Sequence, residues 1–230
     1  MRQLFHIAQH LKTAILYRNT VERFIIIMAW EVFSIIGTIA FALSGAIVAM
    51  EEEYDLFGVY ILGIVTAFGG GAIRNLLIGL PVSTLWNQEM LFQITLISLT
   101  LFFIVPHHLI KHWNRWGNFT DAIGLAAFAI QGAMHAVRLD LPLSAVVVSA
   151  ILTGCGGGIV RDLLAGRKPL VLRDEIYALW AAIAGLIIGL QYPQATDGFL
   201  YFLFGVILFF RYLSYTKEWQ LPRKKLYISK

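Results

Sequence analysis

Apolar residues are grouped along this chain in seven long runs, and short polar links separate the runs. Each run approaches the roughly 20 residues that a helix needs to cross about 30 Å of hydrocarbon. No link is long enough to form a separate domain. We therefore predict an all-α membrane protein with seven transmembrane helices, at residues 27–49, 56–79, 89–107, 119–137, 142–165, 174–191 and 197–215.

Basic residues mark both ends of the chain. In residues 1–26, four of them are interspersed with apolar positions, a spacing typical of an amphipathic helix on the membrane surface. Residues 217–230 hold five more, as expected of a cytoplasmic tail. If the N-terminus lies outside, the inner loops and the tail hold ten Lys and Arg residues and the outer segments hold five. This count predicts a cytoplasmic C-terminus and an outer N-terminus.

The middle of the chain contains one sequence twice, at an offset of 87 residues. Residues 35–79 and 122–166 share 19 identities in 45 positions, which indicates a duplicated supersecondary unit. Residues 27–110 then form one three-helix repeat and residues 111–196 the other, with residues 197–216 as a last, separate helix. Because three spans per repeat is an odd number, the second repeat is inverted relative to the first, an arrangement known from transporters.

Each repeat sets three adjacent glycines inside an apolar span. They are Gly69, Gly70 and Gly71 in the second span and Gly156, Gly157 and Gly158 in the fifth. A glycine inside a helix costs about 1 kcal/mol relative to alanine, so we expect both helices to be kinked there. Freed carbonyls are tolerated at membrane depth only where they face protein or water, which favours an aqueous path between the two spans. The alternative is that the glycines only permit close helix packing.

An arginine follows each triplet by three positions, Arg74 in the first repeat and Arg161 in the second. An arginine within a span is costly unless it reaches the interface, pairs with an acid or meets water. Each one therefore either anchors a helix end or places a charge at one mouth of the path, where it gates ions or binds a solute carboxylate. Asp162 is adjacent to Arg161, and Asp121 opens the fourth span. Asp121 either pairs with an arginine of the other repeat or caps its own helix.

The composition agrees with a membrane protein and excludes several other classes. Hydrophobic residues make up 58% of the chain and charged residues 14%, against about 25% charged in soluble domains. The single cysteine, Cys155, excludes an intramolecular disulfide. We find no zinc-ligand spacing and no credible nucleophile–base pair, so we expect no enzyme, cofactor or metal. The net charge of +4 suits a cytoplasmic tail better than a nucleic-acid site. A histidine cluster in the 106–118 link is interpreted as a solvated loop rather than a metal site, and it comprises His107, His108 and His112.

Two copies of Gly-Gly-Gly-x-x-Arg-[Asp/Asn]-Leu-Leu, each preceded by Ala-Phe-Ala-x-x-Gly-Ala, resemble the bacterial branch of the trimeric intracellular cation channel (TRIC) family. The module of that family is also described as a glycine transporter domain. The resemblance covers roughly residues 30–215. It implies a homotrimer in the bacterial inner membrane in which each protomer has its own pore, lined by the two kinked helices. It also implies the passage of monovalent cations, above all K⁺, past the two triplets, Arg74, Arg161 and Asp162.

The chain departs from the family pattern in its first repeat. Asn75 stands where the pattern leads us to expect Asp, and Ser34 stands where the first span often has Asp. The first repeat therefore has fewer acids than the second, which argues against strict functional symmetry.

Three functions are compatible with these observations. We expect a passive cation channel, in which carbonyls at the kinks replace part of the ion's water shell. The alternative is a carrier for glycine or a similarly small solute, because a helix N-terminus with an arginine suits a carboxylate. A membrane scaffold without a permeant is the third, although a scaffold gains nothing from two disrupted spans.

Overall fold

The computed structural model describes residues 28–105, 113–173, 176–192 and 195–222. Within these ranges every regular element is a helix. The amphipathic segment predicted at 1–26, the three histidines of the 106–118 link and the tail residues 223–230 lie outside the described residues.

The long helices fall where the apolar runs predict them. They are the first helix (Met28–Glu51), α2 (Leu56–Leu77), α3 (Glu89–Ile104), α4 (Trp113–Arg138), α5 (Leu143–Leu164), α7 (Ala178–Gln191) and α8 (Asp197–Thr216). Two short elements, η1 (Val82–Asn87) and α6 (Leu170–Arg173), follow α2 and α5. Capping residues set several of the starts: the Asp55 carboxylate accepts from the backbone N–H of Gly58 at the start of α2, and Pro142 precedes α5.

Among the described residues, four helices are long and apolar enough to cross a membrane, namely the first helix, α2, α5 and α8. The helices α3 and α7 are apolar but shorter, with 16 and 14 residues. The 26-residue helix α4 begins before the predicted start at residue 119 and includes polar positions such as Asp121. The all-helical, multi-pass class is therefore confirmed, whereas the count of seven spans stays a prediction.

The two repeats pack against each other across an approximate two-fold axis. The ring of Phe128 lies against Gly37, and the ring of Phe41 lies against Gly124. Exchanging the repeats converts each of these contacts into the other, because both pairs of positions differ by the same 87 residues. The two rings themselves meet edge to face, with centroids 5.2 Å apart and planes 77° apart. Left-handed backbone recurs at the same offset, in Glu53 and Asp140 and in Gly79 and Gly166.

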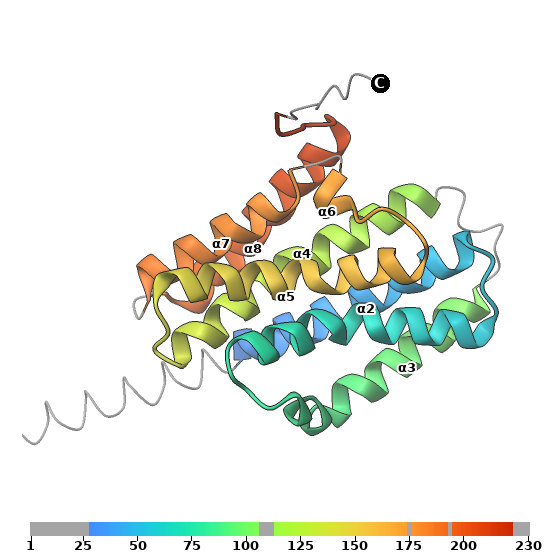
Figure 1. Cartoon of the computed structure of the whole chain (residues 1–230), viewed down its shortest axis with the longest axis horizontal. Helices are drawn as coiled ribbons and strands as arrows, with labels where there is room; N and C mark the ends of the chain where they lie inside the picture. Colours follow the sequence, from blue (N-terminus) through green and yellow to red (C-terminus); the bar gives the residue numbers. More distant parts are fainter. Residues whose placement is uncertain (1–27, 106–112, 174–175, 193–194, 223–230) are drawn as a thin grey trace, which may run out of the picture.

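The helices α2 and α5 cross on this axis and run antiparallel. Gly70 approaches the backbone of Thr153, and Gly157 approaches the backbone of Thr66. Residue numbers therefore increase along one helix in the direction in which they decrease along the other. Figure 1 shows the two helices side by side at the centre of the molecule. Both continue through their glycine triplets without a break. The predicted kinks are therefore not confirmed. Because glycine has no side chain, the backbones of α2 and α5 come into contact at the triplets.

The remaining helices cover the two sides of this central pair. The helices α7 and α8 pack against α4, and α7 also packs against α5. Their shared apolar core includes Leu125, Ile130 and Ile188. On the other side α3 packs against α2, where Leu99 is fully buried. In Figure 1, α3 and the α7–α8 pair accordingly lie on opposite sides of the crossing.

Candidate functional site

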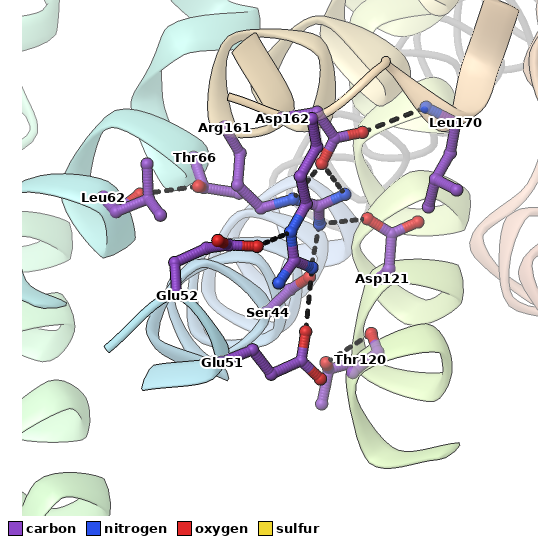
Figure 2. Close-up of polar contacts among 12 residues, drawn as sticks. Ser44, Glu51, Glu52, Leu62, Thr66, Thr120, Asp121, Arg161, Asp162 and Leu170 are labelled. Atoms are coloured by element: carbon purple, nitrogen blue, oxygen red, sulfur yellow. Dashed lines mark hydrogen bonds and ion pairs between the residues drawn. The ribbon is translucent and has the colours of Figure 1, made fainter. Parts of the chain in front are cut away.

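The guanidinium of Arg161 is the centre of a buried ionic cluster that joins three helices. Its Nη1 atom lies 2.7 Å from Oδ1 of Asp121 on α4 and donates to the hydroxyl of Ser44 on the first helix, at 2.5 Å. Its Nε and Nη2 atoms lie 2.8 Å from Oδ1 of Asp162, the next residue along α5. Figure 2 shows Ser44 and Asp121 approaching Arg161 from two other helices, with Asp162 beside it on α5. The cluster therefore ties both repeats together at one end of the α2–α5 crossing.

The opposite charges in this cluster reduce the free-energy cost of burying it. Arg161 is 3% exposed, and it is paired with two carboxylates that are 1% and 3% exposed. Burying a charge is costly unless it is paired and hydrogen-bonded, and this guanidinium meets both conditions. The second oxygen of Asp162 accepts from the backbone N–H of Leu170 and so holds the start of α6. Within the described residues the second oxygen of Asp121 has no hydrogen-bond partner.

A cavity of about 500 Å³ opens beside the Arg161 cluster, and we call it cavity A. Its lining includes Ser44, Asp121, Arg161 and Asp162 at the base and Glu51, Arg167 and Lys168 nearer the loops. Its wall carries both carboxylates and basic side chains beside apolar residues such as Ile47 and Val48, and the charged groups suit hydrated ions.

An exposed ionic clasp closes the loop side of cavity A. Arg167, in the loop after α5, lies 2.8 Å from Glu51 and 2.5 Å from Glu52, at the end of the first helix. Partial burial alone lowers the pKa of Arg167, but the hydrogen bonds and charges of the two glutamates outweigh it, so the pKa is raised. The hydroxyl of Tyr54 also donates to the Leu164 carbonyl, at 2.9 Å. The clasp therefore connects a loop of one repeat to a loop of the other.

The corresponding arginine of the first repeat lies in a different environment. Nε and Nη2 of Arg74 donate to the side-chain oxygen of Asn75, at 3.1 and 2.8 Å, and Asn75 donates to Thr84 in η1. The amide of Gln131 donates to the hydroxyl of Ser34, which occupies the position equivalent to Asp121. Arg74 and Gln131 line a second cavity of about 30 Å³, which we call cavity B.

The glycines of the triplets differ in how closely they are packed. A Cβ atom on Gly70 would lie 2.5 Å from the Thr153 carbonyl oxygen, and one on Gly157 would overlap the Thr66 carbonyl. A Cβ on Gly69 or Gly71 would meet nothing closer than 3.8 Å. Gly156 is tight against the Cα of Gly70. The middle glycines thus serve close packing, as the second interpretation of the triplets predicts.

Gly158 faces the Arg161 cluster instead of a backbone. A Cβ there would lie 3.7 Å from both Nη2 of Arg161 and Oδ1 of Asp121, and 3.3 Å from the hydroxyl of Tyr177. Of the residues predicted for the path, the structure therefore brings Gly158, Arg161, Asp162 and Asp121 together. It places Arg74 and Gly71 separately, in the wall of cavity B.

Two expectations about Asp121 are wrong. It is not a helix cap, because α4 begins at Trp113 and Asp121 lies two turns further along. It also does not pair with the arginine of the other repeat, since its partner is Arg161 of its own repeat. The contact from the other repeat comes from Ser44. Because α2 and α5 run antiparallel, Arg74 lies away from this end of the crossing, and Ser44 of the first helix reaches Arg161 instead.

Besides Ser44, two buried residues near the cluster were not predicted from the sequence. Arg211, in the second half of α8, is fully buried, and its guanidinium lies 4.5 Å from the centre of the Tyr177 ring. The Tyr177 hydroxyl has no hydrogen-bond partner in the described part of the chain. An arginine inside an apolar run was the available signal for Arg211, since such residues mark functional or structural polar sites. No sequence feature distinguished Tyr177.

These features define a class: a multi-pass helical membrane protein built from two repeats, with a buried ionic cluster where they meet. The chain belongs to the glycine transporter family, whose model matches residues 31–107 and 118–192. It is 67% identical to the UPF0126 membrane protein YvgT of Bacillus subtilis, over 86% of this chain and 97% of the relative. It is 36% identical to the UPF0126 inner membrane protein YadS of Escherichia coli K12, over 66% and 74%.

Solved structures extend this relationship to TRIC channels. A prokaryotic TRIC channel in 0.5 M KCl superposes with a TM-score of 0.74 at 32% identity, covering 84% of this chain and 99% of the other. A TRIC orthologue from Rhodobacter sphaeroides gives a TM-score of 0.69 at 30% identity, covering 82% and 95%. The resemblance seen in the sequence is thereby confirmed. The relatives are described as membrane proteins, a transporter family and cation channels, none of them as an enzyme.

Proposed function

We propose that this protein is a channel for monovalent cations, K⁺ above all, in the bacterial inner membrane. Each protomer spans the membrane seven times and contains its own path, and three protomers assemble. The structures of TRIC cation channels that this chain resembles support the channel class and the trimer. The observation that carries the proposal is the arrangement of cavities A and B at opposite ends of the α2–α5 crossing.

The path runs from cavity A, past the crossing, to cavity B. Between them lie the edge-to-face pair Phe41–Phe128 and the backbone contacts of Gly70 and Gly157. In this conformation the cavities are separate, so the path is closed. The Arg161 cluster closes the base of cavity A, and its carboxylates attract cations once the guanidinium moves away from them.

A carrier for glycine or another very small solute is the second candidate. One observation favours it: Arg74 has no carboxylate partner among the described residues, so a solute carboxylate can supply one. The small volume of cavity B argues against it in this conformation, because about 30 Å³ holds little more than one water molecule.

Reconstitution of the purified protein in planar bilayers separates the two functions. A channel gives ohmic single-channel current whose reversal potential follows an imposed K⁺ gradient. A carrier gives saturable, electrically silent uptake of labelled glycine into liposomes. Native mass spectrometry tests the assembly, for which we expect three times the protomer mass of 25.8 kDa.

Phe128→Ala tests the location of the path. Removing this ring widens the constriction between the cavities, so we expect the single-channel conductance to rise by about twofold or more while the reversal potential is kept. Phe202→Ala is the matched control, because Phe202 is an exposed residue on α8. Equal conductance in the wild type and the Phe128 variant, with current present in both, would contradict the proposed path.

A further inference from the structure

The two repeat arginines are equally buried but differently compensated. Arg74 and Arg161 are each 3% exposed. Arg161 is bonded to two carboxylates, whereas the partner of Arg74 is the neutral side chain of Asn75. Asn75 and Ser34 occupy the positions at which the second repeat has Asp162 and Asp121. Within the described residues, the first repeat therefore holds a buried positive charge without a negative partner.

The surroundings of Arg74 add donors and positive charge instead of an acid. Cavity B is lined by Arg74, Thr38, Gln88 and Gln131 among its polar residues, and no carboxylate belongs to its described wall. Trp30 also lines it, and the guanidinium of Arg138 lies over the Trp30 ring at 4.5 Å. Guanidinium, amide and hydroxyl groups all donate hydrogen bonds, which is the chemistry of an anion site.

We propose that cavity B binds a small monovalent anion against Arg74, either a halide ion or the carboxylate of a very small solute. An isolated buried charge is unfavourable, and a bound anion compensates it as Asp121 and Asp162 compensate Arg161. The volume of about 30 Å³ admits a particle slightly larger than water, since a single water needs about 10–15 Å³ of such space.

Thermal unfolding of the full-length protein in detergent tests this site without reference to ion flux. The baseline buffer is potassium gluconate, whose anion exceeds the cavity, and it is replaced stepwise by bromide, formate or glycine at constant ionic strength. At about one hundredfold excess over the dissociation constant we expect the unfolding midpoint to rise by roughly 5 °C. A response to bromide and formate at similar concentrations assigns a free small monovalent anion, and a response to glycine at lower concentration assigns the carboxylate of a small solute.

Asn75→Asp is the decisive variant, because it places a carboxylate beside Arg74 as in the second repeat. We expect its midpoint to be independent of the added anion. Ser34→Asp restores the other missing acid and serves if the first variant does not fold. Asn118→Asp, in the wall of cavity A, makes the same charge change elsewhere and keeps the anion response.

A crystal of the wild type soaked in bromide provides a second readout, for which we expect an anomalous peak within hydrogen-bond distance of the Arg74 guanidinium. Two results overturn the proposal. One is a wild-type midpoint that is the same in gluconate as in all three test solutes. The other is an anion response that persists unchanged in Asn75→Asp. Neither result bears on the channel proposal, which is tested by current and reversal potential.

Discussion

Within each glycine triplet, position decides the role of the residue. Gly70 and Gly157 lie against a backbone carbonyl of the opposite helix, and a carbonyl cannot move aside as a side chain can. Gly69 and Gly71 have ordinary free space around their Cα atoms. Three glycines that look alike in the sequence are therefore not interchangeable in the structure.

Alanine substitutions should separate these roles. We expect Gly70→Ala and Gly157→Ala to lower the stability by about 1–3 kcal/mol each, because overpacking forces the α2–α5 crossing apart. Gly69→Ala is the matched control and should be neutral or stabilising by up to about 1 kcal/mol, since alanine favours the helix. Thermal unfolding in detergent measures both effects. Equal losses at all three positions would contradict the assignment of close contact to the middle glycines.

The buried arginines of the two repeats provide a second contrast between matched residues. Arg161→Gln leaves Asp121 and Asp162 buried without a cation, so we expect a loss of about 3–5 kcal/mol. Arg74→Gln removes a charge that has no acidic partner in the described structure, so we expect little loss or a gain. Unfolding midpoints of the two variants, compared in a gluconate buffer, check this difference. A larger loss of stability in the Arg74 variant than in the Arg161 variant would contradict the assignment of Asp121 and Asp162 as partners that stabilise Arg161.

The candidate site could be predicted from the sequence only in part. The arginines, Asp162 and the triplets are local motifs, and their repetition made them recognisable. Ser44 and Tyr177 were not predictable, because each reaches the cluster through tertiary packing of a separate helix. The partner of Asp121 was predicted wrongly. Which residues of α2 and α5 face each other depends on how the two helices are aligned where they cross, and the sequence does not show this alignment.

At the scale of helices and loops, the Arg167 clasp is a solvent-accessible connection between the repeats. Its side chains are between 24% and 36% exposed, so solvent screens the ion pairs. Such a pair contributes at most about 1 kcal/mol to stability and can open without unfolding a helix. The clasp therefore suits a connection that opens and closes.

Arg167→Gln should affect opening more than stability. We expect the unfolding free energy to fall by less than about 1 kcal/mol, while the open probability in bilayers rises about twofold or more. The difference from the wild type should shrink in 1 M salt, where the Debye length is about 3 Å. Lys217→Gln is the matched control, because it removes one charge from an exposed position outside cavity A. An unchanged open probability in the Arg167 variant would argue against the clasp.

For the whole molecule, the remaining question is which face lies in the cytoplasm. The helix α5 has 22 residues and is about 33 Å long, enough to separate Leu139 and Lys168 by the hydrocarbon thickness. The clasp places the loop after the first helix on the same face as Lys168. The excess of basic residues predicts that this face is cytoplasmic.

Cysteine labelling in intact cells checks the orientation. The single native cysteine, Cys155, is fully buried, so it gives little background. We expect a membrane-impermeant maleimide to label Leu139→Cys in intact cells and Lys168→Cys only after permeabilisation. The opposite pattern would invert the topology and place cavity A outside.

The overall fold was largely predictable, because apolar runs of sufficient length leave a chain in lipid few alternatives to helices. The end of α2 and the start of α5 were predicted within a few residues. The early start of α4 was not, because its first two turns carry polar and aromatic residues that no apolar run includes. The kinks were inferred from helix propensity alone. Packing between the two triplets compensates the low propensity, so continuous helices result.

The α2–α5 crossing has a mechanical consequence. Helices normally lock together because the side chains of one fill the spaces between the side chains of the other. Here Gly70 and Gly157, at the middle of the contact, have no side chain and lie against main-chain carbonyls of the opposite helix, so few side chains interdigitate there and we expect the two helices to pivot at this point. A small rotation at this pivot becomes a larger displacement toward the helix ends that carry Arg161 and Arg74, the residues that line the two openings of the proposed conduit.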